Sequence, residues 1–301
     1  PRIPVNTMSS LKLSKITVDL PRPTLDDIPA SIQSQFESTP IDLKPNASVA
    51  IAVGSRGIAN LSVIVKCVID QLKARNWRPF IVPAMGSHGG ATAEGQREVL
   101  AAYDITESNM GCPIRSSMEV VELDSSGLEN AAYMDRNANG ADGIVVINRI
   151  KPHTDFHGTY ESGLVKMIVI GLGKERQAFE MHCHGVHGLK ELVPKTAERI
   201  LDLGKITLGI GVVENAYDET AKVEVIPGSQ ILDREADLIK EAHTNLPRLP
   251  ISDVDILGVD QLGKDMSGTG LDTNVIGRIR IPTEIEPSSP TIKSIYVSDL
   301  T

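Results

Sequence analysis

Two histidine-rich segments flank a lysine in an apolar run, and these residues are the best suited to chemistry. The segment "KPHTDFHG" carries His153 and His157, and "MHCHGVH" carries three more of the seven histidines. Between them, Lys166 lies in "ESGLVKMIVIGLG". An ammonium group in such a run either extends its stem to water or sits in a pocket, where burial favours the neutral amine. We therefore expect Lys166 to line a site.

Two glycine-rich loops offer further functional groups. In "GSRG", Arg56 could clamp a carboxylate, because its planar fork matches two oxygens; the alternative is a solvated surface arginine. In "PAMGSHGGAT", His88 could act as a general acid or base near neutral pH, or could simply bond within its own turn. A third polar, glycine-rich stretch, "KDMSGTGLDTN", precedes Arg280.

The histidine spacing also suits a metal. The patterns H-x-D-x-H and H-x-H supply imidazole and carboxylate groups, which are good zinc ligands. One hypothesis is therefore a zinc-dependent hydrolase that uses His153, Asp155, His157 and His182. The sequence contains neither a complete H-E-x-x-H nor a C-x-x-C pair, so this pattern is a loose one.

Short apolar runs alternate with segments of helical periodicity. Strands are expected at 48–55, 78–84, 142–150, 206–215 and 253–260, and helices at 60–75, 91–104, 188–204 and 233–246. This order predicts an α/β fold, an open and mostly parallel sheet with helices on both faces. Ligands bind beyond the carboxyl ends of such strands. The loops with Arg56, His88 and His153 each follow a different strand, so we expect them at one edge of the sheet.

The organisation of the chain suggests two domains. The first 45 residues contain seven prolines and are expected to be an extended lead-in with a strand at 15–20. The stretch "NLPRLP" at 245–250 is the best linker candidate. We therefore predict an N-terminal α/β domain at 1–248 and the beginning of a second, C-terminal α/β domain at 249–301, within which the chain stops.

Composition excludes several classes of protein. A net charge of −9 argues against nucleic acid as a partner, because phosphate binding needs a basic surface, but it permits a small anionic substrate. Three irregularly spaced cysteines do not form a disulfide framework, which suggests a reducing, cytoplasmic location. Neither a membrane span nor a signal peptide is expected.

The order of these motifs resembles the nickel-pincer lactate racemase family. An arginine loop, a "GSH" loop, a "KPH" strand end, a lysine in S-G-x-x-K and a later histidine follow one another between about residues 48 and 280. The chain is similar to a homologue branch that carries "ESGL-x-KM", rather than to the founding racemases. The resemblance implies an isomerase, a racemase or epimerase of a small 2-hydroxy acid, that works by hydride transfer to a nickel-pincer cofactor.

The resemblance also implies roles for particular residues. Lys166 matches the lysine that attaches the nickel-pincer nucleotide covalently, and His182 matches the nickel ligand, with His184 as its alternative. His88 and His153 match the two acid/base histidines. The residues that match binders of the substrate carboxylate are Arg56 and Arg280. Cofactor-maturation enzymes are the implied protein partners.

Two departures from the founding pattern lie where substrate would be held. Val53 and Gly57 replace an aspartate and a proline around the clamp arginine, and the spacing from His153 to Lys166 is longer. The resemblance therefore does not fix lactate as the substrate. A third hypothesis is a non-catalytic protein that binds a small anion; it would need the clamp arginine but no histidine at position 88.

Overall fold

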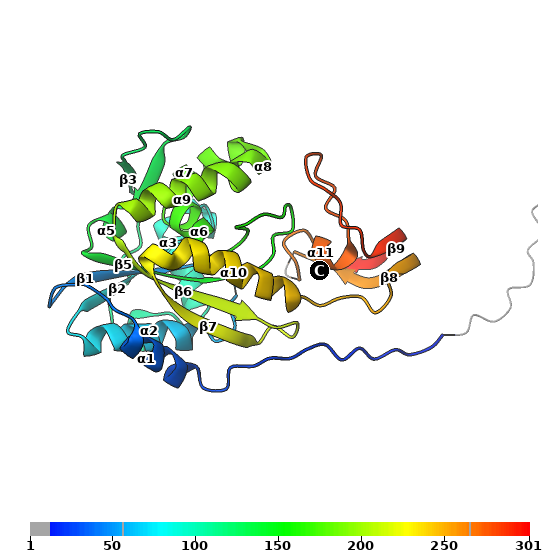
Figure 1. The fold of residues 1–301 in the computed structure, drawn as a ribbon, viewed down its shortest axis with the longest axis horizontal. Helices are drawn as coiled ribbons and strands as arrows, with labels where there is room; N and C mark the ends of the chain where they lie inside the picture. Colours follow the sequence, from blue (N-terminus) through cyan, green and yellow to red (C-terminus); the bar gives the residue numbers. More distant parts are fainter. Residues whose placement is uncertain (1–12, 56, 265) are drawn as a thin grey trace, which may run out of the picture.

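A five-stranded sheet forms the centre of the computed structural model, which describes residues 13–55, 57–264 and 266–301 (Figure 1). The strand order is β2-β1-β5-β6-β7; the first four strands are parallel and β7 is antiparallel to β6. The strands are β1 (Ser48–Val53), β2 (Arg78–Pro83), β5 (Gly143–Arg149), β6 (Ile206–Glu214) and β7 (Thr220–Pro227). The predicted α/β class and the mostly parallel sheet are confirmed.

Helices cover both faces of this sheet, because its strands are apolar on both sides. In β1, Val49, Ile51 and Val53 pack with α1 and α2, whereas Ala50 and Ala52 face the layer that contains α6, α7, α9 and α10 (Figure 1). The helices are α1 (Ile28–Ser38), α2 (Leu61–Ala74), α3 (Ala93–Ala101), α4 (Glu107–Met110), α5 (Arg136–Asn139), α6 (Leu164–Lys166), α7 (Lys174–Cys183), α8 (Gly185–His187), α9 (Val193–Asp202), α10 (Ile231–Thr244) and α11 (Thr273–Ile276). Shorter helical turns are η1 (Gly89–Ala91), η2 (Met167–Gly171), η3 (Gly188–Leu192) and η4 (Gly228–Gln230).

The N-terminal segment departs from prediction in two ways. Residues 15–20 form no strand, because no neighbouring strand pairs with them in the structure. The expected extended lead-in also contains helix α1. Asp27 caps it by accepting a hydrogen bond from the Ala30 N–H at 2.9 Å, and Pro29 lies in the first turn, where its missing N–H costs nothing.

Both outer strands of the sheet have partners along their free edges. On β7, the Gln35 side chain donates to Val223 O and accepts from Val225 N–H, both at 2.9 Å. On β2, Ile81 donates to Pro113 O and accepts from Arg115 N–H, both at 2.8 Å. A helix side chain thus covers one edge, and a loop backbone covers the other.

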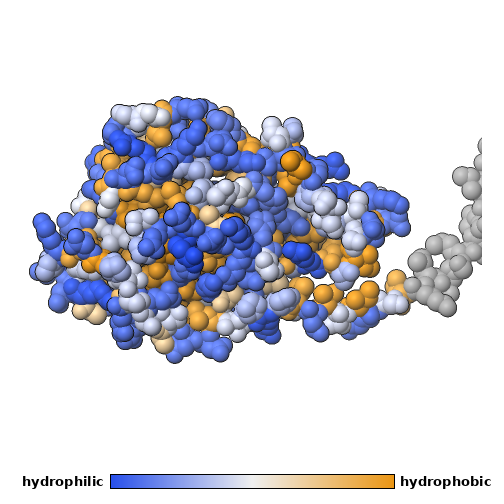
Figure 2. Space-filling model, in the orientation of Figure 1, coloured by the Kyte–Doolittle hydropathy of each residue, from blue (hydrophilic) through white to orange (hydrophobic). Residues whose placement is uncertain are grey.

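Two smaller sheets lie outside the central one. Strands β3 (Val120–Leu123) and β4 (Ala132–Asp135) form an antiparallel pair, and β8 (Asp253–Leu262) and β9 (Thr291–Leu300) form a parallel pair. The second pair is largely exposed, and large apolar side chains such as Ile256 and Tyr296 reach its surface. Figure 2 shows a mostly hydrophilic face with apolar areas scattered between. The division of the chain into domains at 248 and 249 stays a prediction.

Within the described ranges, every helix is too short or too polar to traverse a lipid bilayer.

Candidate functional site

The loops after β1, β2 and β5 lie at one edge of the sheet, as predicted, because these three strands are neighbours and run parallel. The loops come together around Gly54, which directly follows β1. A Cβ atom at Gly54 would lie 2.7 Å from Met167 Cε and 3.6 Å from Asn148 Oδ1. The absence of a side chain at Gly54 leaves room for this contact, so the end of β1 lies against the residue after Lys166 and against β5.

His88 lies in the loop after β2 and is exposed. Its Nδ1 atom forms a short hydrogen bond with the Ser55 hydroxyl, which belongs to the loop after β1. The Gln96 side chain donates to Gly86 O at 2.9 Å and to His88 O at 3.2 Å, which fixes the backbone of the turn. Gly89 adopts a φ of 65°, a conformation that favours glycine. The loop therefore presents the imidazole beside Ser55 at the sheet edge.

Lys166 and His153 are in direct contact, with 2.9 Å between Lys166 Nζ and His153 Nε2. The other ring nitrogen of His153, Nδ1, accepts a hydrogen bond from the Asp155 N–H at 3.1 Å. The ring also stacks on Phe156 with 4.5 Å between centroids. The loop between residues 151 and 163 thus orients the His153 ring that contacts Lys166.

The segment around Lys166 combines a short α-helix with a wider turn. Lys166 ends α6 and directly precedes η2, a π-helical turn, a feature that is frequent at functional sites. Its neighbours Val165, Met167 and Ile168 are buried, whereas Lys166 itself is partly exposed. The lysine therefore lies among buried apolar neighbours in the sequence, while its own side chain reaches His153.

A buried glutamate, Glu235 of α10, supports the beginning of α6. One of its oxygens accepts a hydrogen bond from the Val165 N–H at 2.9 Å, at the end of the helix where backbone donors are otherwise unpaired. A Cβ atom at Gly163 would lie 2.3 Å from Glu235 Oε1, so the carboxyl occupies the space of a side chain there. Complete burial raises the pKa of Glu235 to about 7, although hydrogen bonds from Val165 and Leu164 lower it in part.

A second buried glutamate, Glu161, supports His153. Its Oε2 atom accepts a hydrogen bond from the His153 N–H at 2.6 Å, and its side chain also contacts the imidazoles of His157 and His243. Burial alone raises the pKa of Glu161, but the hydrogen bonds from His157, His243 and the His153 backbone outweigh it and lower the pKa to about 2. The sequence analysis missed Glu161, Glu235 and His243.

His182 lies on α7 and is exposed, as is His184, which caps the same helix. The Nδ1 atom of His182 lies 2.5 Å from Ala178 O, one turn earlier. The Ala178 side chain packs close to Gly86 of the His88 loop, 3.5 Å from where a Cβ atom would lie. Helix α7 therefore passes beside the loop that holds His88 at Ala178, one turn before His182.

Of the two arginines predicted to bind the substrate carboxylate, the structure describes one. Arg56 lies outside the described residues. Arg280 is exposed, with 3.9 Å between its Nε and Glu286 Oε1. The segment just before it contacts the His153 loop, because Asn274 donates to His153 O at 3.1 Å and Thr273 donates to Thr154 O at 2.5 Å. The substrate-binding role of Arg280 stays a prediction.

The predicted zinc cluster of His153, Asp155, His157 and His182 is wrong. The structure does not group these side chains, because the loop backbone turns His153 toward Lys166 while His182 bonds along its own helix. In the described parts of the chain, one group of three or more candidate ligands occurs, and it consists of His157, Glu161 and His243.

The sequence analysis also missed Lys174, the last residue of the "IGLGK" stretch. It is fully buried, with 3.2 Å between its Nζ and Asp135 Oδ2, and it donates to Pro83 O and Gln96 Oε1. Burial lowers the pKa of Lys174 and raises that of Asp135, while the contact between them opposes both shifts. These contacts tie the start of α7 to the ends of β4 and β2.

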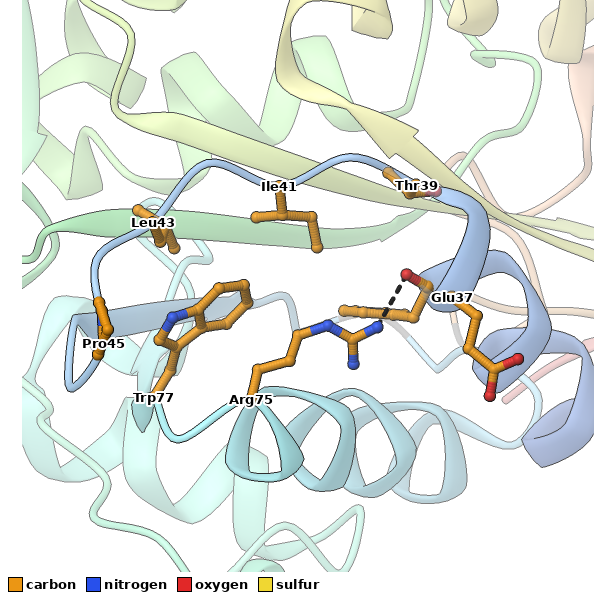
Figure 3. Close-up of a pocket in the computed structure, with 8 residues that line it drawn as sticks. Glu37, Thr39, Ile41, Leu43, Pro45, Arg75 and Trp77 are labelled. Carbon is orange, nitrogen blue, oxygen red and sulfur yellow. Dashed lines mark hydrogen bonds between the residues drawn. The ribbon is translucent and has the colours of Figure 1, made fainter.

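A surface hollow of about 390 Å³ lies away from these residues, between α1 and the start of β2 (Figure 3). Trp77 and Ile41 line it, and its cation, Arg75, already donates to Phe36 O at 2.8 Å. Among the residues that line it, Glu37 is an exposed carboxylate, and none is a histidine or lysine.

Comparison with known proteins identifies the matching family. The family described as the lactate racemase N-terminal domain matches residues 26–191, more than half of the chain. The match includes His88, His153, Lys166 and His182. No curated protein sequence matches the chain significantly.

Two solved structures share the fold at low sequence identity. A protein from Thermotoga maritima is 18% identical with a TM-score of 0.54, and the alignment covers 79% of this chain and 63% of that one. The lactate racemase apoprotein from Thermoanaerobacterium thermosaccharolyticum is 13% identical with a TM-score of 0.51, and the alignment covers 81% of this chain and 64% of that one. The alignments thus span less than two thirds of either structure.

Proposed function

The chain belongs to the lactate racemase N-terminal domain family, and we propose that it is an isomerase, a racemase or epimerase of a small 2-hydroxy acid. The contact of Lys166 Nζ with His153 Nε2 at 2.9 Å carries this proposal. It joins an amine that could hold a cofactor to an imidazole that could move a proton. Both residues lie at the ligand-binding edge of a parallel sheet and within the residues that match the family.

The bonding around His153 places its imidazole against the amine of Lys166. Because Nδ1 accepts the Asp155 N–H, the neutral ring carries its proton on Nε2. The 2.9 Å contact places this ring nitrogen against the Lys166 amine. An uncharged amine is the form of lysine that can become covalently attached to another group.

Proton transfer at the substrate hydroxyl is assigned to His88 and His153. One imidazole takes the proton when the carbon is inverted in one direction, and the other returns it from the opposite side. Ser55 orients His88, and Asp155 and Phe156 orient His153. By resemblance to the family, Arg56 and Arg280 would hold the substrate carboxylate.

The residues present suit the nickel-pincer nucleotide that the family resemblance implies. Lys166 offers the amine for covalent attachment. The Nδ1 atom of His182 is engaged with Ala178 O, so Nε2 is the nitrogen that it offers to nickel, and such a second hydrogen bond is usual for a ligating histidine. When bound, the group would supply a hydride acceptor, which avoids a high-energy carbanion at the substrate carbon.

Co-production with cofactor-biosynthesis proteins and nickel tests the proposal. We expect the intact mass to rise by a single adduct, and the purified protein to interconvert the enantiomers of a 2-hydroxy acid in a chiral screen. Hydrolysis of a substrate bond without inversion of any 2-hydroxy acid would contradict the proposal. A protein that bound hydroxy acids but inverted none of them, even with the adduct, would favour the non-catalytic anion-binding hypothesis.

A further inference from the structure

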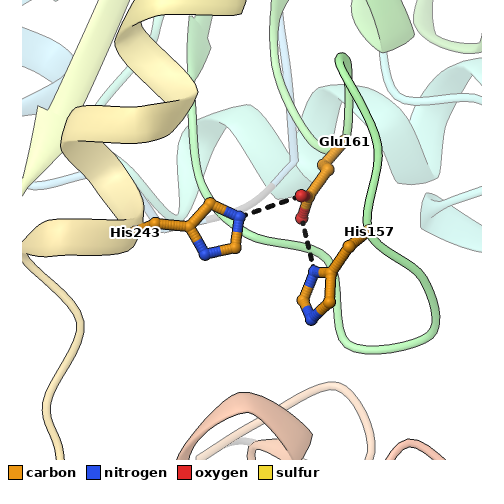
Figure 4. Close-up of side chains that lie close together, drawn as sticks. All are labelled: His157, Glu161 and His243. Carbon is orange, nitrogen blue, oxygen red and sulfur yellow. Dashed lines mark hydrogen bonds and ion pairs between the residues drawn. The ribbon is translucent and has the colours of Figure 1, made fainter. Parts of the chain in front are cut away.

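The side chains of His157, Glu161 and His243 converge from two elements (Figure 4). His157 and Glu161 belong to the loop after β5, and His243 lies in the last turn of α10. His243 Nε2 is 2.9 Å from Glu161 Oε1, and His157 Nδ1 is 3.4 Å from Glu161 Oε2. Figure 4 shows both imidazoles pointing at the same carboxylate, with their ring nitrogens on either side of it.

The carboxylate at the centre is held by the backbone. Glu161 is 4% exposed, and it accepts the His153 N–H at 2.6 Å on one oxygen and the Gly158 N–H at 3.3 Å on the other. Each carboxylate oxygen has two acceptor positions, so backbone donors occupy one position on each oxygen and leave the other toward the imidazoles. Backbone donors of this kind orient a metal-ligating carboxylate.

We propose that His157, Glu161 and His243 form a binding site for one divalent cation of the Zn²⁺ class. Two imidazole nitrogens and one carboxylate oxygen are a common zinc set with an open fourth position. Bond lengths of about 2.0–2.2 Å place tetrahedral ligand atoms about 3.4 Å apart. The candidate ligand atoms here all lie within 4.8 Å of one another. Mg²⁺ and Ca²⁺ are disfavoured because they prefer oxygen ligands throughout.

The site is accessible from solvent. The His157 and His243 side chains are 36% and 37% exposed, while the Glu161 side chain is 1% exposed. A cation can therefore enter between the imidazoles and keep a water molecule as its fourth ligand. This site goes beyond the proposed function, since it shares no residue with Lys166 or His182 and requires no nickel-pincer cofactor.

A bound cation would have a structural consequence. It would join the His153 loop to α10, and Glu161 already bonds the His153 backbone. We therefore expect the cation to raise the melting temperature of the apoprotein, because the site exists in the folded state and is absent from the unfolded chain.

The test uses the full chain, made without cofactor-maturation enzymes and treated with a chelator. ZnCl₂ is titrated by calorimetry, with MgCl₂ as the control salt. We expect one Zn²⁺ per chain at a saturable site and no binding of Mg²⁺. Absence of saturable Zn²⁺ binding in the wild-type apoprotein would overturn the proposal. Neither result depends on racemase activity. A negative result here would therefore leave the proposed function untouched, and a negative result in the racemase test would leave the cation site untouched.

Two conservative variants separate a metal site from a hydrogen-bonded cluster. His243→Gln and His157→Asn place an amide N–H near the original ring nitrogen, so each can still donate to Glu161 but is a poor zinc ligand. Each is expected to melt like the wild type without metal, and to bind Zn²⁺ about 100-fold more weakly. His187→Asn on α8 is the control and should bind as the wild type does. Wild-type affinity in His243→Gln, or loss of binding in His182→Asn alone, would refute this assignment.

Discussion

Lys166 and Lys174 lie on either side of the same π-helical turn, yet their surroundings differ. Lys174 is fully buried, pairs with Asp135 at 3.2 Å and donates to two further oxygen atoms from different parts of the fold. Lys166 is partly exposed and has an imidazole, His153, at 2.9 Å. The comparison separates a lysine that holds the fold together from one that is available for chemistry. Lys166 has apolar sequence neighbours on both sides, whereas Lys174 is followed by Glu175 and Arg176, and burial distinguishes the two lysines in the fold.

The carboxyl groups near the two lysines extend this comparison. Asp135 meets Lys174 directly in an ion pair, whereas Glu235 bonds the backbone at the start of the helix that carries Lys166. A buried charge pair is costly to break, because the remaining partner is left uncompensated. A buried carboxyl group with backbone partners can instead become neutral by binding a proton.

The largest expected effect is that of Lys166→Ala on activity. In protein matured with nickel and the cofactor enzymes, we expect this variant to lose both the mass adduct and all racemase activity. Its stability should change by less than about 1 kcal/mol, because the side chain that is removed is partly exposed. Mass spectrometry, a chiral assay and thermal unfolding measure the three quantities. Full activity in the variant would assign Lys166 a structural role and would contradict the distinction drawn between it and Lys174.

Lys174→Met should show the reverse pattern, with its main effect on folding. Removal of the ammonium leaves Asp135 buried without its cation, which costs about 3–5 kcal/mol in the free energy of unfolding. Urea denaturation measures this loss. The double variant Lys174→Met with Asp135→Asn should recover part of it, because the uncompensated charge is gone. A loss below about 1 kcal/mol in the single variant would contradict the structural role.

Glu235 should make stability depend on pH. Its pKa in the folded protein is raised from 4.5 to about 7, so the folded state binds the proton more tightly than the unfolded chain does. The resulting stability is fully present below about pH 4.5 and is lost as pH rises through about 7. At about 1.4 kcal/mol per pKa unit, the loss amounts to roughly 3 kcal/mol.

The variant Glu235→Gln tests this prediction, since its amide oxygen can still accept the Val165 N–H but carries no titratable proton. We expect it to match the wild type near pH 5 and to be more stable above pH 7, in denaturant unfolding measured at both pH values. Parallel pH profiles of the two proteins would show that Glu235 does not titrate in this range.

The smallest effect is expected for Lys66→Ala on the surface of α2. Lys66 and Asp70 form an ion pair one turn apart, with 42% and 52% of their side chains exposed. Such pairs contribute about 0.3–0.5 kcal/mol, because water and salt screen them. Thermal unfolding should therefore barely change. A loss as large as that of Lys174→Met would mean that ion pairing, rather than burial, distinguishes the lysines.

The fold could be predicted from the sequence to a large extent, because its central strands are continuous apolar runs. The predicted strands at 48–55 and 142–150 contain β1 and β5 within two residues at either end. Helix α1 was missed because the first 45 residues contain seven prolines, although one of them lies at a position where a helix tolerates it. The predicted strand at 15–20 failed because a strand depends on a partner that local sequence does not reveal.

The candidate site was only half predictable. The sequence indicated His88, His153 and Lys166 through their loops and motif order. It gave no signal for His243, which lies in an amphipathic helix far from the other histidines along the chain. Glu161 and Glu235 were missed because a charged residue is expected at the surface, and the sequence does not show which partners would allow its burial. Glu161 follows His157 by four residues, and this spacing was the one available hint.

The Gln35 side chain on the free edge of β7 has a consequence for association between molecules. Exposed strand edges can pair with the edge of another chain and lead to aggregation. Gln35 donates to one backbone group of β7 and accepts from another, much as a neighbouring strand would, and residues 113–115 do the same on β2. The central sheet is therefore closed to strand addition at these positions. Assembly with a second copy, where it occurs, would have to use other surfaces.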